Sequence, residues 1–240
     1  MANMPVGWTW PPDLTMERAG DECLADLGRL GVHWLRVPAE HAINTPIIVI
    51  DMRFGSLTVE RTRSKGSLVM DCALARALAR DAAPVLRGLH VTTLRVGQIH
   101  ADRDIGGKPG VLSRHSLGLA MDIYALVGED GREHLVEPGY LAGDPVLHLA
   151  EILLGRTGAF RTLMTPGNDP GPHHNHFHLE ARAFGDKVVG RLTRGATSGW
   201  CALLDVLTLA GGGPTGLRWF ALLCHAGDPP GRVAAATLKR

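Results

Sequence analysis

Two short stretches of the sequence bring together side chains that bind metal ions. The first runs from Ser113 to Ile123 and places a histidine, His115, ahead of a carboxylate, Asp122. Gly118 permits a sharp turn between a loop and a strand, and Ala120 is small enough for close packing. His115 is then expected at the mouth of a strand on which Asp122 points to one face. Such a pair suits zinc, which binds these ligands at roughly 2.0–2.2 Å.

The second stretch runs from His173 to Glu180 and reads His-His-Asn-His-Phe-His-Leu-Glu. Because side chains alternate along a strand, its apolar residues would pack on the core and its polar residues would face a cleft. The polar face would carry His174, His176, His178 and Glu180. One imidazole from this row would complete a His–Asp–His ligand set and leave a coordination position for water, as catalytic zinc requires. Zinc lowers the pKa of that water toward ~7 and polarises carbonyl groups.

Each stretch taken alone has a plainer interpretation. A single histidine such as His115 is usually a surface or hydrogen-bonded side chain. The histidine row alone is also typical of a segment that binds metals without selectivity. A His-Asn-His string occurs in nucleases, but neither a ββα pattern nor a basic surface accompanies it here. The two stretches together, on two strands of suitable length, favour a zinc site.

Helices and strands must position these stretches. Periodic apolar residues predict helices over residues 15–36, broken at Gly31, over 69–87 with Gly88 as its C-cap, and over 145–157. Strands are expected at 47–50, 56–59, 92–99, 118–126 and 174–183, with a hairpin to 133–136. Residues 102–110 and 166–172 are expected to be loops. This order of elements predicts an α+β fold with an antiparallel sheet.

The composition changes after about residue 185, where Gly, Leu and Ala dominate and the motifs end. We therefore expect three parts: an N-terminal segment at 1–19, a domain at 20–185 and a helical C-terminal extension at 186–240. The extension would hold two helices within 190–225, joined by a Gly/Pro turn, and a loose end.

Composition also excludes several classes of function. The chain has 240 residues and a formal net charge of +1, with scattered Lys and Arg. Nucleic-acid binding is therefore not expected. No window approaches the ~20 apolar residues that span a bilayer, so no membrane span is expected. The N-terminus lacks the features of a secretory signal, which leaves a cytoplasmic role, release by lysis or injection by a secretion apparatus.

The four cysteines are Cys23, Cys72, Cys201 and Cys224. None belongs to a C-x-x-C pair, so they do not resemble zinc ligands or a redox pair. We interpret them as buried free thiols. A Cys23–Cys72 disulfide would require an exported protein.

The two metal motifs resemble those of a known family. The patterns S-x-H-x-x-G-x-A-x-D-I, from Ser113, and H-x-x-H-x-H-L-E, from His173, are similar to those of the bacterial extensin-like C-terminal domain proteins. These belong to the wider group of lysostaphin, D-alanyl-D-alanine peptidases and sonic hedgehog. The resemblance covers roughly residues 20–183 and includes the helix that carries Cys23 and the segment that begins at Asp71. It implies a small antiparallel sheet with helices packed against it, and one zinc ion.

The resemblance also implies roles for single residues. The family's ligand pattern falls on His115, Asp122 and His178. The first histidine of its H-x-H motif falls on His176, a non-ligand that assists the chemistry. An upstream arginine, implied to bind a substrate carboxylate or a developing oxyanion, falls on Arg103. The spacing of His173, His176 and His178 is also similar to that of the penicillin-insensitive murein endopeptidases.

The chain departs from the family pattern at two places. Relatives usually carry Tyr-x-Cys-Arg before the first metal motif, where this chain has His100-Ala-Asp-Arg103. Relatives often have an acidic residue three positions before the final ligand, where this chain has Asn175, and an amide cannot serve as a general base. Proton transfer is then expected of His176, or else of His173 or His174.

These expectations combine into zinc-assisted hydrolysis of an amide bond, in peptidoglycan cross-links or another D-amino-acid peptide. His176 would help to activate water, Arg103 would hold the negative oxygen, and an imidazole would return the proton to the leaving amine. The alternative is a non-catalytic zinc-stabilised module that binds cell-wall peptides, which Asn175 favours. A general metal carrier would instead bind several ions weakly.

Overall fold

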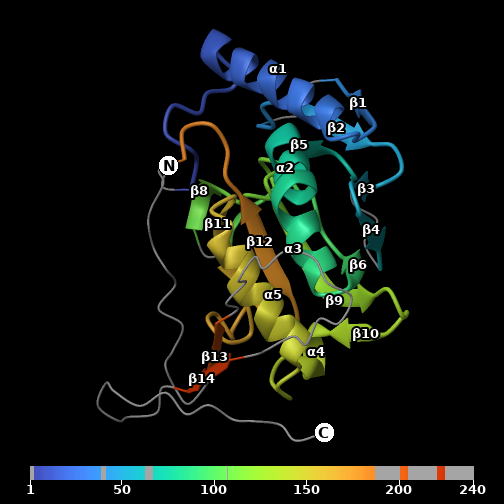
Figure 1. The fold of residues 1–240 in the computed structure, drawn as a ribbon. Coiled ribbons are helices and arrows are strands. Elements are labelled where there is room, and N and C mark those ends of the chain that lie inside the picture. Colours follow the sequence, from blue (N-terminus) through green and yellow to red (C-terminus); the bar gives the residue numbers. More distant parts are fainter. Residues whose placement is uncertain are drawn as a thin grey trace, which may run out of the picture. The chain divides into compact units, whose positions relative to one another are not determined.

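The computed structural model describes residues 3–38, 42–62, 67–106 and 108–186, together with two strands at 201–204 and 221–224. The chain divides into two compact units, Met1–Thr193 and Arg194–Arg240. The first unit is an α+β domain, which confirms the predicted fold class (Figure 1).

A seven-stranded sheet forms the centre of the first unit. Its strands lie in the order β11-β12-β9-β6-β4-β3, and β10 pairs with β9. Their bounds are β3 Arg53–Phe54, β4 Leu57–Arg61, β6 Val91–Val96, β9 Ala120–Gly128, β10 Glu133–Leu135, β11 Phe160–Met164 and β12 Phe177–Ala181. The β9–β10 hairpin was predicted and is confirmed. All pairs are antiparallel except β4 with β6, which a helical crossover joins, as parallel strands require.

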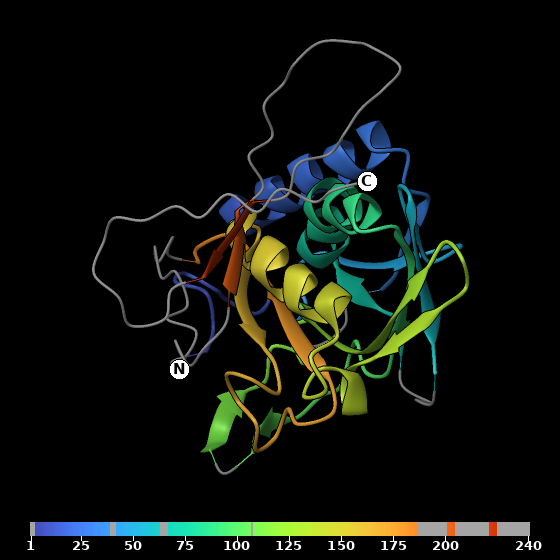
Figure 2. The same ribbon diagram turned by 60° about the horizontal axis from the view of Figure 1, so that its bottom comes forward.

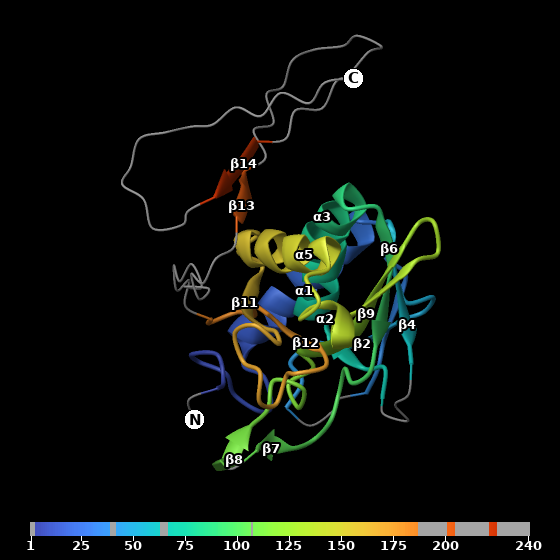
Figure 3. The same ribbon diagram turned by 90° about the horizontal axis from the view of Figure 1, so that it is seen from below.

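Helices cover one face of this sheet. The helices of this unit are α1 Leu14–Arg29, which packs on α2, then α2 Cys72–Ala77, a π-helical turn η1 Leu78–Ala82, α3 Ala83–Gly88, α4 Val136–Gly139 and α5 Pro145–Arg156. The helix α3 packs on β6, α5 on β11 and α2 on β12, and Figures 2 and 3 show them on the same side of the sheet. Asp13, Asp71 and Asp144 each accept a backbone N–H at the start of α1, α2 and α5, which satisfies donors that a helix leaves unpaired.

Apolar and polar side chains alternate along β12, so that the apolar ones face the core and the polar ones face the opposite side of the sheet. On β12, Phe177, Leu179 and Ala181 are fully buried in the helix-covered core. The intervening residues His178 and Glu180 therefore point to the other face. The polar residues of this strand thus collect on the face of the sheet that the helices leave uncovered.

Two smaller sheets complete the first unit. The strands β1 Trp34–Arg36, β2 Pro46–Val49 and β5 Met70–Asp71 pair in that order. The strands β7 Asp104–Ile105 and β8 Lys108–Leu112 form a hairpin, which Figure 3 shows on the side away from α3 and α5.

Several predicted boundaries are wrong. The predicted break at Gly31, which has a positive φ of 69°, is confirmed, but the helix predicted over 15–36 does not resume after it, because the chain turns into β1. The helix predicted from residue 69 begins at Cys72, because Met70 and Asp71 pair with β2. Its C-cap is Leu89 rather than Gly88. The segment 102–110, predicted as a loop, contains most of the β7–β8 hairpin.

The helical prediction for the C-terminal extension is wrong where the structure describes that region. In the second unit, β13 Cys201–Leu204 pairs antiparallel with β14 Ala221–Cys224. Short apolar runs on either side of a Gly/Pro turn fit a β-hairpin as well as a helical pair, and periodicity alone does not separate the two. The rest of the predicted helices lies outside the described residues.

The prediction of free thiols is wrong for Cys23 and Cys72, which form a disulfide with Cα atoms 6.1 Å apart. Cys23 lies in α1 and Cys72 is the first residue of α2, and these two helices pack together. Their separation of 49 residues hides this contact in the sequence. The side chains of Cys201 and Cys224 lie outside the described residues. Within the described part of the chain, no helix has the length and hydropathy of a membrane span.

Candidate metal centre

A tight turn after Ser113 positions His115. The backbone N–H groups of Gly118 and Leu119 donate to the carbonyls of His115 and Arg114, each at 3.0 Å. Gly118 has a φ of 64°, and a Cβ atom there would lie 2.6 Å from the backbone nitrogen of Asp71. Only glycine satisfies both conditions, so the predicted sharp turn is confirmed. The turn buries the His115 side chain completely.

Strand pairing positions the other two residues. Asp122 on β9 and His178 on β12 are direct partners in the antiparallel register. Side chains of directly opposed residues project to the same face of a sheet. Ala120, with no exposed surface, lies at the start of β9 in close contact with its neighbours, as predicted.

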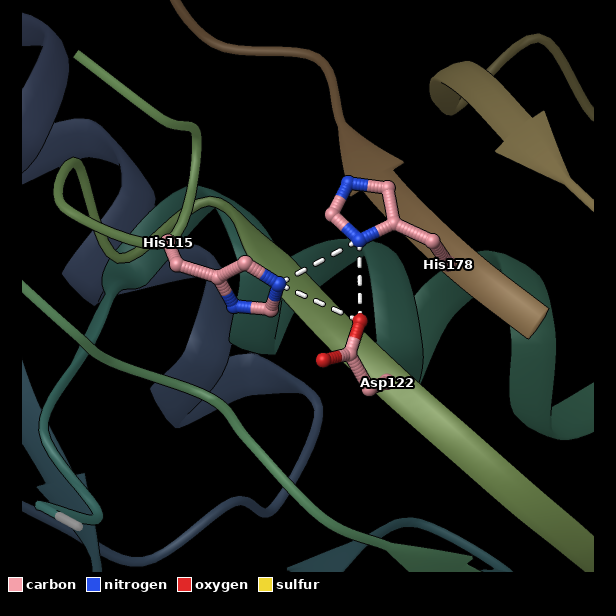
Figure 4. A group of neighbouring side chains, drawn as sticks. All are labelled: His115, Asp122 and His178. Carbon is pink, nitrogen blue, oxygen red and sulfur yellow. Dashed lines mark hydrogen bonds and ion pairs between the residues drawn. The ribbon is translucent and has the colours of Figure 1, made fainter. Parts of the chain in front are cut away.

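The three side chains converge on one point (Figure 4). The Nε2 atom of His115 lies 3.2 Å from Asp122 Oδ1 and 3.2 Å from Nδ1 of His178, and the latter two atoms are 2.9 Å apart. All three residues are buried, and they have the donor set and spacing to hold a metal ion. The structure therefore brings His115, Asp122 and His178 together, as the sequence predicted.

The outer nitrogen of each imidazole faces an acceptor. Nδ1 of His115 lies 3.0 Å from the carbonyl oxygen of Ile99, and Nε2 of His178 lies 3.2 Å from a carboxylate oxygen of Glu180. A carbonyl and an ionised carboxylate only accept hydrogen bonds, so each outer nitrogen carries its proton. With a metal ion bound, the inner nitrogens would present their lone pairs beside the Asp122 oxygen. Three acceptors this close together require a positive charge between them, so the residues fit a metal cation.

Local electrostatics also favour a positive charge at this point. Burial would raise the pKa of the Asp122 carboxyl, but hydrogen bonds to His115 and His178 outweigh it and hold the pKa far below its usual range. Burial would lower the pKa of His178, but Asp122 and Glu180 raise it to about 9. In the metal-free protein a proton on His178 therefore supplies the charge that a metal ion would otherwise provide.

The candidate centre borders a cleft of about 1350 Å³ on the uncovered face of the sheet. Asp122, His178 and the turn before β12 contribute to its wall, and the β7–β8 hairpin forms another part. Arg103 also lines this cleft. Its backbone is fixed to the His115 turn, since its N–H donates to Ser116 Oγ at 2.8 Å and its carbonyl accepts from the Ser113 N–H at 2.9 Å.

The prediction that the histidine row lies on a strand is wrong for most of its members. The strand β12 begins at Phe177, and residues 170–175 form turns. The N–H of His173 donates to the carbonyl of Asp169 at 3.2 Å, so the chain turns immediately before the predicted strand. His174 is exposed, with Nδ1 3.2 Å from the carbonyl of Gly171, and is not part of the cleft lining.

Two histidines of this turn nevertheless reach the candidate centre. Nε2 of His176 lies 3.5 Å from Asp122 Oδ1, and its ring stacks on Tyr124 with centroids 5.3 Å apart. The ring of His173 lies 5.1 Å from that of His176 and 5.2 Å from that of His178. Both side chains line the cleft.

Asp169 and Arg161 were not predicted as part of the site, and Glu180 was predicted on the polar face without a role. Asp169 accepts a hydrogen bond from Nδ1 of His173 at 2.9 Å. Glu180 contacts His178, and Arg161 donates to Glu180 at 2.9 Å. The four-residue spacing of Asp169 and His173 and the shared strand face of His178 and Glu180 are local signals, whereas Arg161 lies on a different strand.

Fold and site together define an α+β domain with a buried His–Asp–His centre open to a cleft. The family model described as Extensin-like protein C-terminus matches residues 21–190. The chain therefore belongs to the extensin-like C-terminal family. Neither a curated protein nor a solved structure matches it.

Proposed function

We propose that this domain is a zinc-dependent hydrolase of amide bonds, within the wider group of lysostaphin, D-alanyl-D-alanine peptidases and sonic hedgehog. Its substrate would be a peptidoglycan cross-link or another D-amino-acid peptide. One observation carries the proposal: two imidazole nitrogens and one carboxylate oxygen meet at a buried point beside a large cleft.

The donor set favours zinc over other common ions. Two neutral imidazoles and one carboxylate match the three protein ligands of catalytic zinc sites, whereas magnesium and calcium prefer oxygen ligands alone. Zinc bound by His115, Asp122 and His178 would supply a more acidic water and polarise the substrate carbonyl.

His176 is placed to accept a proton from water. Burial is the main cause that lowers its pKa to about 4, so the imidazole is neutral at pH 7. Nδ1 of His176 lies 2.8 Å from the side-chain oxygen of Asn175, which fixes the proton on Nδ1 and leaves the Nε2 lone pair free to accept. Asn175 would thus orient the base in a chain that lacks the acidic residue of its relatives.

His173 and Arg103 would serve the later stages of hydrolysis. Asp169 holds Nδ1 of His173, so Nε2 would be free to receive the proton that His176 takes from water and to pass it to the leaving amine. Burial lowers the pKa of His173 as well, which keeps it neutral until it takes up a proton. Arg103, at the cleft wall, would bind the negative oxygen or a carboxylate of the substrate.

The size of the cleft supports an extended substrate. Pockets for small molecules occupy roughly 300–1,000 Å³, and this cleft exceeds that range at about 1350 Å³. The Cys23–Cys72 disulfide supports a place of action in an oxidising compartment, which is where a cell wall lies.

Digestion of purified peptidoglycan tests the proposal. Zinc-loaded protein should release new muropeptides whose masses identify the cleaved amide bond, and the Asp122→Ala variant should release none. If zinc-loaded wild type yields only the products of the Asp122→Ala digest, the domain is not a peptidoglycan hydrolase.

A non-catalytic module that binds cell-wall peptides is the second candidate. It is favoured by Asn175, because the side chain that touches His176 is an amide and not a carboxylate. Such a module would co-sediment with peptidoglycan in the presence of zinc, and the masses of the muropeptides would stay unchanged.

A further inference from the structure

A chain of polar contacts extends from the candidate centre to the N-terminal segment. One carboxylate oxygen of Glu180 lies 3.2 Å from Nε2 of His178, and the other accepts from Nη1 of Arg161 at 2.9 Å. The same Arg161 nitrogen donates to the side-chain oxygen of Asn3 at 2.8 Å. Asn3 in turn donates to the carbonyl of Leu112 at 3.0 Å.

Burial makes this chain of contacts strong. The side chain of Glu180 is 7% exposed and that of His178 is 8% exposed. An ionised carboxylate with so little exposure needs charged partners, and Glu180 has one on each side. Both terminal nitrogens of the neighbouring Arg114 bind Asp186 instead.

The position of Glu180 determines which nitrogen of His178 faces the candidate centre. The imidazole has two nitrogens, and the proton resides on the one that has an acceptor beside it. Glu180 keeps that proton on Nε2, and Nδ1 then carries the lone pair. Without this acceptor, the imidazole is free to place its proton on Nδ1 or to rotate, and either change removes the lone pair from the centre.

We propose that Glu180 is a positioning residue for the metal ligand His178, and that Arg161 holds Glu180 in place. This inference rests on the metal centre of the proposed function but not on hydrolysis. Carboxylates behind metal-bound histidines commonly strengthen metal binding by about 10–100-fold. We expect Glu180 to act in the same range.

Zinc affinity of purified variants tests this role, measured at pH 7 by competition with a chromophoric chelator. Glu180→Ala should weaken zinc binding about 10–100-fold. Glu180→Gln should weaken it less, because the carboxamide oxygen still accepts from Nε2 but carries no charge. Arg161→Ala should have a smaller effect than Glu180→Ala, since it removes only the partner of the carboxylate.

Asp144→Asn is the matched control. Asp144 also contacts a histidine, at 2.8 Å from Nδ1 of His134, in a similarly buried site. It lies outside the cleft lining, so its loss should leave zinc affinity unchanged. Melting temperatures of the metal-free variants correct for any loss of folded protein. If Glu180→Ala does not fold, Glu180→Gln carries the test, because it keeps the side-chain volume.

A second measurement separates positioning from general stability. In nitrogen-15 NMR spectra of the zinc-loaded protein, the Nε2–H signal of His178 should move in Glu180→Gln, whereas the Nδ1–H signal of His115 should stay. Equal zinc affinity in wild type, Glu180→Gln and Glu180→Ala would overturn the inference. So would weaker affinity with an unchanged His178 signal. Zinc binding without any hydrolysis would refute the proposed activity alone and leave this inference standing.

Discussion

The cleft is built from two regions that differ in how they hold their side chains. Asp122, His178 and Glu180 project from paired strands, where backbone register fixes their positions, and all three are buried. His173 and His176 come from the turn before β12, and each depends on a local polar partner, Asp169 or Asn175.

This difference separates two tasks. Metal ligands must converge within tenths of an ångström, and strands in register hold such geometry well. Proton-transfer groups must keep a free lone pair and move slightly during a reaction, and a turn allows this. We therefore expect changes on the strands to affect metal binding and changes in the turn to affect turnover.

Loss of a strand ligand should have the largest effect. Among the described residues, Asp122 is the carboxylate that touches both ligand histidines, and Asp122→Ala leaves His178 with Glu180 alone and His115 with no carboxylate beside it. Zinc affinity should fall by more than the ~100-fold that loss of a group behind a ligand produces, and hydrolysis should be lost. Chelator competition measures the affinity. Tight zinc binding by this variant would show that the ion lies elsewhere.

Loss of the turn histidine nearest the centre should change turnover and not metal binding. His176→Ala should keep zinc affinity within about threefold of wild type but reduce turnover by about 10²–10⁴-fold, the usual contribution of a general base. Muropeptide release per bound zinc is the measurement. Wild-type turnover in this variant would remove His176 from the mechanism.

The sequence predicted the strand half of the site better than the turn half. The His115 turn follows from one glycine, and alternation places Asp122 and His178 each on one face of its own strand, which are local rules. The pairing of β9 with β12, which brings the two residues to the same face, came from the structure. The strand predicted over 174–183 is confirmed from Phe177 to Ala181, but residues 174–176 lie outside it, after a turn in which the His173 N–H donates to the carbonyl of Asp169.

Contacts between distant segments lay beyond such rules. Arg161 meets Glu180 only because β11 pairs with β12, and Cys23 meets Cys72 only because α1 packs on α2. Neither pairing leaves a periodic signal in the sequence. The resemblance to a family supplied the ligand set, whereas the groups that orient those ligands came from the structure.

Zinc affinity of the candidate centre should also depend on pH. The pKa of His178 in the metal-free protein is raised to about 9 by Asp122 and Glu180, which outweigh burial. Zinc must displace this proton, so its apparent affinity should rise by about tenfold per pH unit as pH approaches 9 and then level off.

The stability of the metal-free protein should fall as pH rises, whereas the zinc affinity rises. A histidine whose pKa is raised on folding stabilises the folded state fully below its unfolded value of about 6.5, and this contribution is lost as pH rises through 9. The increase in melting temperature on adding zinc should therefore be larger at pH 9 than at pH 6.5. An increase that does not change over this range would contradict the assigned proton.

The smallest effect is expected when Asp169, the partner of His173, is changed. Asp169→Asn keeps the size of the side chain but removes the charge that orients His173, so turnover should fall by about tenfold, less than for loss of the base itself. Zinc affinity should remain that of wild type.

The matched control is His174→Ala, which changes the adjacent histidine of the same turn. Because His174 is exposed and outside the cleft lining, that variant should match wild type in both measurements. Equal losses in the two variants would mean that the turn acts only as a flexible segment, and that Asp169 does not orient His173.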